Sequence, residues 1–186
     1  MHAGLPQKPA AVIPVLGVLS PNPANRAPTP EQRAQGPATR RLRELGWVGG
    51  QNLRFEYANA GGREERLPEL AAALVEKRVD VIWALGTGAA VAAARATKTI
   101  PIVFWGAPYA VELGLVDSFA RPGRNVTGVA TTFGEVSQKQ FEMLKEIVPG
   151  ARRLASINVP GLLRTVSGGL YDAYPPLRSA ARKLGM

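Results

Sequence analysis

The chain has 186 residues, 46% of them hydrophobic, which supports one substantial core, or one domain with a fragment of another. It contains no cysteine and one histidine, His2, so disulfides and cysteine-based metal sites are excluded and a histidine-based catalytic triad lacks its base. The net charge of +9 raises a nucleic-acid hypothesis, but the basic excess is spread out, and the cluster of Arg40, Arg41 and Arg43 fits a solvated helix face without interleaved aromatic residues.

The first part of the chain predicts a strand and a helix. Residues 1–14 are expected to be disordered, and the apolar stretch that follows Ala10 lacks the basic cluster of a signal peptide. Its VLGVLS segment is interpreted as the first strand. A Pro- and Asn-rich loop then leads to a helix that begins at about Pro37, or at Pro30 with a kink, and Gly46 is placed to cap its end.

The next part of the chain predicts parallel strands joined by helices. The alternation in residues 52–58 is typical of a strand. Residues 66–108 then give an amphipathic helix, an apolar strand from Val79 to Leu85, a Gly-rich turn, an Ala-rich helix and a second apolar strand, Ile100–Trp105. Nearly continuous apolar strands are typical of parallel sheets with helices on both faces. The fold class is therefore predicted to be α/β with a doubly wound parallel sheet.

Alternating elements continue to the end of the chain. We expect a short helical segment at residues 113–120, a fifth strand at 126–131 and an amphipathic helix at 137–148. A sixth strand at 153–158 and a last helix at about 171–184 resemble the opening of a second domain.

Open parallel sheets bind ligands beyond the carboxyl ends of their strands, so the strand ends identify the candidate binding residues. They are small or hydroxyl-bearing in the first sheet, and the sixth strand adds an amide. We predict that the ligand site comprises Ser20, Asn22, Gly86, Thr87, Gly106, Ala107, Thr131 and Asn158.

The turn at Gly86 and Thr87 has two interpretations. Its helix amides and the Thr87 hydroxyl could hold a ligand carboxylate, or the glycines could simply make a tight turn that Thr87 caps. The sequence Gly86-x-Gly88-x-x-Val91 lacks the third glycine of the dinucleotide fingerprint. We expect Asp80 to be a turn or capping group, and Trp83 and Trp105 to be core residues, although Trp105 lies near enough to a strand end to reach a ligand.

Three segments resemble a known family: RELGWVGGQNL at 43–53, RLPELAAALVEKRVDVIWALGTGAAVAAARATKTIPIVF at 66–104 and GLVDSFARPGRNVTGV at 114–129. Together they resemble the bacterial ABC-transporter substrate-binding protein family that includes tryptophan- and other amino-acid-binding members. The resemblance implies the type I periplasmic-binding-protein fold, in which two lobes close over a small solute. It also implies delivery to a membrane permease and an extracytoplasmic location.

The resemblance implies a division of the chain into lobes. Residues 15–135 would be a Rossmann-like first lobe, 136–151 a hinge-crossing helix and 152–186 part of a second lobe, so the chain is expected to be an incomplete form. Many members have an acidic residue in a Gly-Asp-Pro context after the fourth strand. Here the sequence is Gly106-Ala107-Pro108, so a carboxylate that meets a ligand amine is missing from that position.

The predicted function is binding of a small polar or amino-acid-like solute in an import system, without catalysis, cofactor, metal, nucleic acid or a membrane span. Two alternatives remain: an enzyme on a doubly wound sheet, which needs an acid–base group that the strand ends lack, and a basic interaction module, motivated by the charge.

Overall fold

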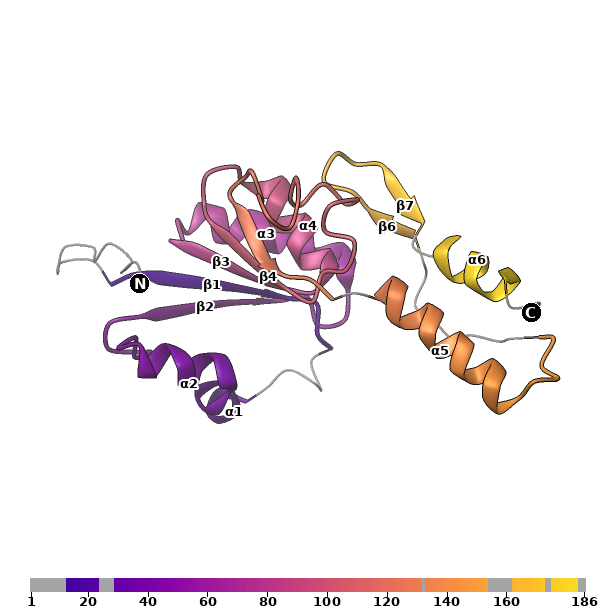
Figure 1. Cartoon of the computed structure of the whole chain (residues 1–186). Helices are drawn as coiled ribbons and strands as arrows, with labels where there is room; N and C mark the ends of the chain where they lie inside the picture. Colours follow the sequence, from indigo (N-terminus) through magenta and orange to yellow (C-terminus); the bar gives the residue numbers. More distant parts are fainter. Residues whose placement is uncertain (1–12, 24–28, 132, 154–161, 173–174, 184–186) are drawn as a thin grey trace.

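The computed structural model describes residues 13–23, 29–131, 133–153, 162–172 and 175–183. Its centre is a five-stranded parallel sheet in the order β2-β1-β3-β4-β5 (Figure 1), which confirms the predicted α/β class. The strands are β1 (Val15–Ser20), β2 (Arg54–Asn59), β3 (Val81–Leu85), β4 (Ile102–Trp105) and β5 (Val126–Val129).

Helices connect the strands, and a hairpin and a further helix follow the sheet. The helices are α1 (Pro30–Gln35), α2 (Pro37–Glu44), the 3-10 helix η2 (Glu64–Arg66), α3 (Leu67–Glu76), α4 (Thr87–Ala96), α5 (Phe133–Ile147) and α6 (Pro175–Lys183). The hairpin pairs β6 (Leu162–Arg164) with β7 (Leu170–Asp172) in antiparallel orientation.

The direction of the crossovers places the helices on two sides of the sheet. The chain passes from β1 outward to β2 and then back across β1 to β3, so right-handed connections put α1 and α2 opposite α3. Figure 1 shows α1 and α2 below the strands and α3 and α4 above them. The topology is therefore doubly wound, as the sequence predicts.

The helix between β1 and β2 is interrupted at Gly36, as expected from the Gly-Pro pair. Pro37 opens α2, where a missing amide costs nothing, and Gly46 lies just beyond its end with φ +88°. The Gly46 amide bonds the Arg43 carbonyl and the Trp47 amide bonds the Leu42 carbonyl. This pair of bonds is a Schellman motif, so the predicted role of Gly46 is confirmed.

One face of the sheet packs against α3 and α4 and forms the core. Leu67, Ala71 and Leu74 recur at helical spacing on α3 and are all buried, as are residues 89–94 of α4. On the strands beneath them, Ile82 and Phe104 are at most 2% exposed. The alanines of α4 allow this helix to lie close to the sheet.

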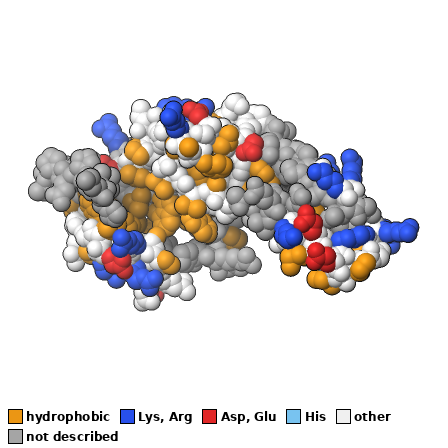
Figure 2. Space-filling view, viewed as in Figure 1, with side chains coloured by type: hydrophobic (Ala, Val, Ile, Leu, Met, Phe, Trp, Pro, Cys, Tyr) orange, Lys and Arg blue, Asp and Glu red, His pale blue; other side chains and the backbone are white. Residues whose placement is uncertain are grey.

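The opposite face of the sheet is open at β4 and β5, and for these strands the prediction of cover on both faces is wrong. Val103 is 40% exposed, and Trp105 and Val129 are each 60% exposed. These side chains lie on one face because Trp105 and Val129 are paired in register and Val103 is two residues before Trp105. Val18 of β1 lies on the same face and is only 5% exposed, so the cover is missing over β4 and β5 and not over β1. Figure 2 shows hydrophobic side chains gathered over the sheet on this side.

The connection from β4 to β5 contains turns rather than the predicted helix at 113–120. Gly114 has φ +73°, which a continuing helix does not allow, and the Asp117 amide bonds the Pro122 carbonyl in the next turn. The segment still contributes to the core, since Leu113 and Leu115 are fully buried. The spacing of its apolar residues therefore indicates that they are buried, but it does not indicate a helix.

The last part of the chain also departs from the prediction. Residues 154–161, which include most of the predicted sixth strand and Asn158, lie outside the described residues. The last helix begins at Pro175 and not at 171, because Leu170–Asp172 forms a strand of the hairpin. The tip of the hairpin contacts the first sheet unit: the Val166 amide donates to the Leu113 carbonyl at 2.8 Å.

Candidate functional site

The carboxyl ends of the strands form one edge of the sheet, which we call the rim. It consists of the last residue of β1, β3, β4 and β5 with the two residues after each: Ser20–Asn22, Leu85–Thr87, Trp105–Ala107 and Val129–Thr131.

Backbone hydrogen bonds hold the rim together beyond the strands themselves. The Gly86 amide donates to the Trp105 carbonyl at 2.8 Å, and the Gly106 amide donates to the Val129 carbonyl at 2.9 Å. Both glycines have positive φ, +82° and +77°, which lets the chain turn immediately after the last ladder bond. The ends of β3, β4 and β5 are thereby fixed relative to one another.

At the end of β1, the Ser20 hydroxyl is used within the protein. Ser20 is 7% exposed, and its Oγ accepts a hydrogen bond from the Asn22 amide at 3.2 Å. The side chain of Asn22 is half-buried beside it. The two residues are adjacent, as predicted, and the turn that they form leaves Asn22 as the more accessible donor.

The turn at Gly86 leads directly into α4. Gly86 is the N-cap, Thr87 is the first helical residue, and no side chain caps this end of the helix. The alternative in which Thr87 acts as the cap is therefore wrong. The amides of the first turn and the partly exposed Thr87 side chain lie at the rim, where the positive end of the helix dipole favours a negative group.

The remaining predicted residues differ in accessibility. Ala107 is fully buried and belongs to the core, so only its backbone lies at the rim, whereas Thr131 is exposed just beyond β5.

A carboxylate that the sequence analysis overlooked also lies near the rim. Glu64 opens η2, soon after the end of β2. One of its carboxylate oxygens is 3.4 Å from the position that a β-carbon on Gly88 would occupy, so the acid stands against the first turn of α4. The signal was present in the sequence, since Glu64 follows Gly61-Gly62 soon after the end of the second strand.

Two other residues take places that bear on the predictions. Asp80 Oδ2 accepts a hydrogen bond from the Val15 amide at 2.8 Å at the start of β1, which confirms a structural role away from the rim. Trp105 is 60% exposed on the open face, so its assignment to the core is wrong. Trp83 lies on the same face and is half-buried.

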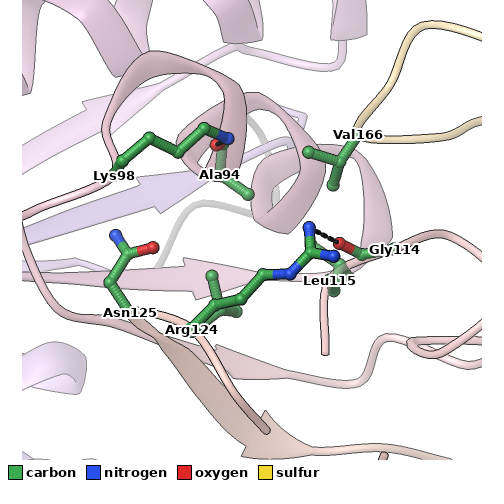
Figure 3. A pocket seen from close by; sticks show the side chains of 8 residues that line it. Ala94, Lys98, Gly114, Leu115, Arg124, Asn125 and Val166 are labelled. Carbon is green, nitrogen blue, oxygen red and sulfur yellow. Dashed lines mark hydrogen bonds between the residues drawn. The ribbon is translucent and has the colours of Figure 1, made fainter. Parts of the chain in front are cut away.

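A small pocket lies at the other end of the sheet. Its volume is about 220 Å³, and Figure 3 shows that Lys98, Arg124 and Asn125 surround it with Val166 of the hairpin tip. The Arg124 guanidinium is engaged by the Asp117 carboxylate and by the Gly114 carbonyl at 3.1 Å. Asn125 directly precedes β5, so this pocket is at the amino ends of the strands and is separate from the rim.

The described residues offer little acid–base or metal chemistry. Among them, no group of three or more acidic, histidine or cysteine side chains could hold a metal ion. Burial raises the pKa of the Tyr109 phenol above its usual 10.0, and the Glu112 carboxylate raises it further. Neither residue lies on the rim.

Comparisons with known proteins agree on one family. A family model described as "ABC transporter substrate binding protein" matches residues 32–166, well over half of the chain. A tyrosine-binding protein from Clostridioides difficile (strain R20291) is 33% identical over 116 residues, which are 62% of this chain and 33% of that protein.

Solved structures give the same result. A conserved domain protein from Vibrio cholerae superposes with a TM-score of 0.75 at 28% identity, covering 94% of this chain and 55% of the other. An ABC domain from Streptococcus pneumoniae, solved in complex with L-Trp, gives a TM-score of 0.60 at 26% identity, covering 74% of this chain and 44% of the other. The chain thus spans about a third of the curated relative and about half of these structures.

Proposed function

Because the chain belongs to the ABC transporter substrate-binding protein family, we propose that it serves as the solute-binding component of an ABC-type import system. It binds a small polar or amino-acid-like solute at the rim and presents that solute to a membrane permease. The observation that carries this proposal is the family match over residues 32–166, which includes β2 to β5 and the Gly86 turn.

The rim supports a specific mode of ligand binding. The uncapped first turn of α4 offers backbone amides to a ligand carboxylate, and the Thr87 hydroxyl adds a donor beside them. Asn22, at the end of β1, supplies a second polar side chain from a neighbouring strand. Since Gly86 and Gly106 are tied into the backbone network, these groups need little rearrangement to receive a ligand.

The second wall of the cleft is assigned to a facing lobe. In this proposal residues 15–135 form the first lobe, 136–151 cross the hinge and 152–186 open the second lobe. The similarity to proteins about twice as long supports this division. We propose that Thr131, just beyond β5, lines the cleft from the first lobe, and that Asn158 lines it from the second.

The family is one of extracytoplasmic binding proteins and not of enzymes. In the described ranges, none of the helices has the length and hydropathy needed to cross a bilayer. On the ground of the family match, we propose that a separate permease delivers the solute across the membrane and that this protein works on the extracytoplasmic side.

Calorimetric titration of the full-length protein with L-tyrosine and L-tryptophan, the amino acids named for two relatives, tests the proposal. Thr87→Ala should weaken binding roughly tenfold, because it removes a hydrogen bond to a charged group. Thr127→Ala is the matched control, since Thr127 is exposed in the middle of β5 and away from its end. If neither amino acid binds, and no solute in a broad screen raises the melting temperature of the protein, the proposal is wrong.

A further inference from the structure

The rim poses a problem for a zwitterionic ligand. The fully buried Ala107 offers no carboxylate to a ligand ammonium, and the other predicted rim residues are neutral. An ammonium group that enters a partly dehydrated cleft without an anionic partner loses hydration that it does not recover. A solute-binding protein for amino acids therefore needs an acid from elsewhere.

Glu64 is placed to supply that acid. It reaches the rim from η2, and its carboxylate lies 3.4 Å from the β-carbon position at Gly88, one residue from Thr87. Within the described part of the chain, the Glu64 side chain has no hydrogen bond or ion pair, so it is not committed to a structural partner.

We propose that Glu64 binds the ammonium group of an amino-acid ligand and selects against acids that lack it. This inference rests on the proposed function. A ligand carboxylate beside Thr87 brings a negative charge close to Glu64, and the ligand's own ammonium, two bonds away from that carboxylate carbon, offsets the repulsion. A deaminated acid has no such group, so Glu64 opposes its binding.

A structural role for Glu64 makes a different prediction. An acidic side chain at the start of η2 and beside α4 also stabilises helix ends through the dipole. Removing its charge would then lower the melting temperature and leave the relative affinity for the two ligand types unchanged. The ratio of the two affinities separates the roles.

The test compares Glu64→Gln with wild type in the full-length protein, using L-tyrosine, L-tryptophan and their deaminated counterparts, 3-(4-hydroxyphenyl)propanoate and 3-(indol-3-yl)propanoate. Glu65→Gln is the matched control, because it removes the same charge from the next residue of η2. We expect Glu64→Gln to weaken binding of the amino acid about tenfold and to leave or improve that of the deaminated acid. We expect Glu65→Gln to change neither.

The outcomes separate the two proposals. If wild type binds an amino acid and Glu64→Gln weakens both ligand types equally or not at all, the role of Glu64 is overturned and the proposed function stands. If wild type binds neither amino acid in calorimetry, nor any solute in the broad screen, the proposed function fails, and the role of Glu64 fails with it.

Discussion

The Arg95 guanidinium at the end of α4 donates a hydrogen bond of 2.7 Å to the carbonyl of Thr165 at the tip of the β6–β7 hairpin. A second bond, from Arg95 Nε to the Val166 carbonyl, measures 3.2 Å. The two bonds join segments that are 70 residues apart in the chain. They fix the hairpin tip to the sheet unit at a position remote from the rim.

Arg95→Ala should release the hairpin tip from α4. Each lost bond contributes about 0.5–1.5 kcal/mol, so hydrogen exchange of the Val166 amide should become several-fold faster. Exchange in β3 should be unchanged. Arg63→Ala, which removes an exposed arginine before η2, is the control. Unaltered exchange at Val166 would show that the bond from its amide to Leu113 is sufficient to hold the tip.

Gly128→Ala should destabilise the sheet strongly. A β-carbon at Gly128 would lie 2.1 Å from the carbonyl oxygen of Phe104 on the neighbouring strand, and backbone atoms there cannot move aside without breaking the ladder. We expect a loss of about 3 kcal/mol or more, measured by urea unfolding. Gly150→Ala has open space and should change the stability by less than about 1 kcal/mol. Similar effects of both substitutions would contradict the close approach of β4 and β5.

Truncation of two adjacent residues of β4 should lower the stability by very different amounts. Phe104 is 2% exposed and packs in the core, so Phe104→Ala should cost about 3–5 kcal/mol in the free energy of unfolding. Trp105 points to the open face, and Trp105→Ala should cost about 1 kcal/mol or less while reducing the binding of an apolar dye. The two variants, measured in the same denaturation assay, control for each other. A larger cost at Trp105 would mean that the open face is covered in solution.

Stability should fall at high pH in a manner that depends on Tyr109. Its pKa in the folded protein is raised above 10.0 by burial and by Glu112, so the folded state holds the phenol proton more tightly than the unfolded state. This contribution is fully present below about pH 10, the unfolded value, and is lost as the pH rises through the folded pKa.

Chemical denaturation of wild type and Tyr109→Phe between pH 8 and 11.5 (roughly the range that brackets a tyrosine pKa) checks this dependence. The variant should lose stability less steeply above pH 10. Glu112→Gln should move the ultraviolet titration of Tyr109 to lower pH, since it removes a charge that raises the pKa. An unchanged titration in Glu112→Gln would exclude the charge contribution.

Much of the sheet could be predicted because parallel strands carry a strong local signal. The apolar runs that end at Leu85 and Trp105, with the glycine after each, define β3 and β4 and the turns at the rim. Gly36-Pro37 and Gly46 likewise define α2, because both act through backbone geometry within one turn.

The errors arise where tertiary contacts decide the outcome. Leu113 and Leu115 are spaced as in a helix, but Gly114 adopts positive φ and the segment turns into the core. Trp105 belongs to an apolar run typical of a buried strand, but it is 60% exposed because its burial depends on which elements cover β4 in the folded chain. Glu64 contacts α4 from another element, so its place after a strand end indicates the rim but not the contact with Gly88.

The open face of the sheet has a thermodynamic consequence. Denaturant sensitivity and the heat capacity change of unfolding both scale with the surface newly exposed, and Trp105, Val103 and Val129 are already in contact with water in the folded chain. The 186-residue chain should therefore unfold over a broad range of urea, with a shallow dependence of stability on temperature. A partner surface that covers this face would make both the urea-induced and the thermal unfolding transitions steeper.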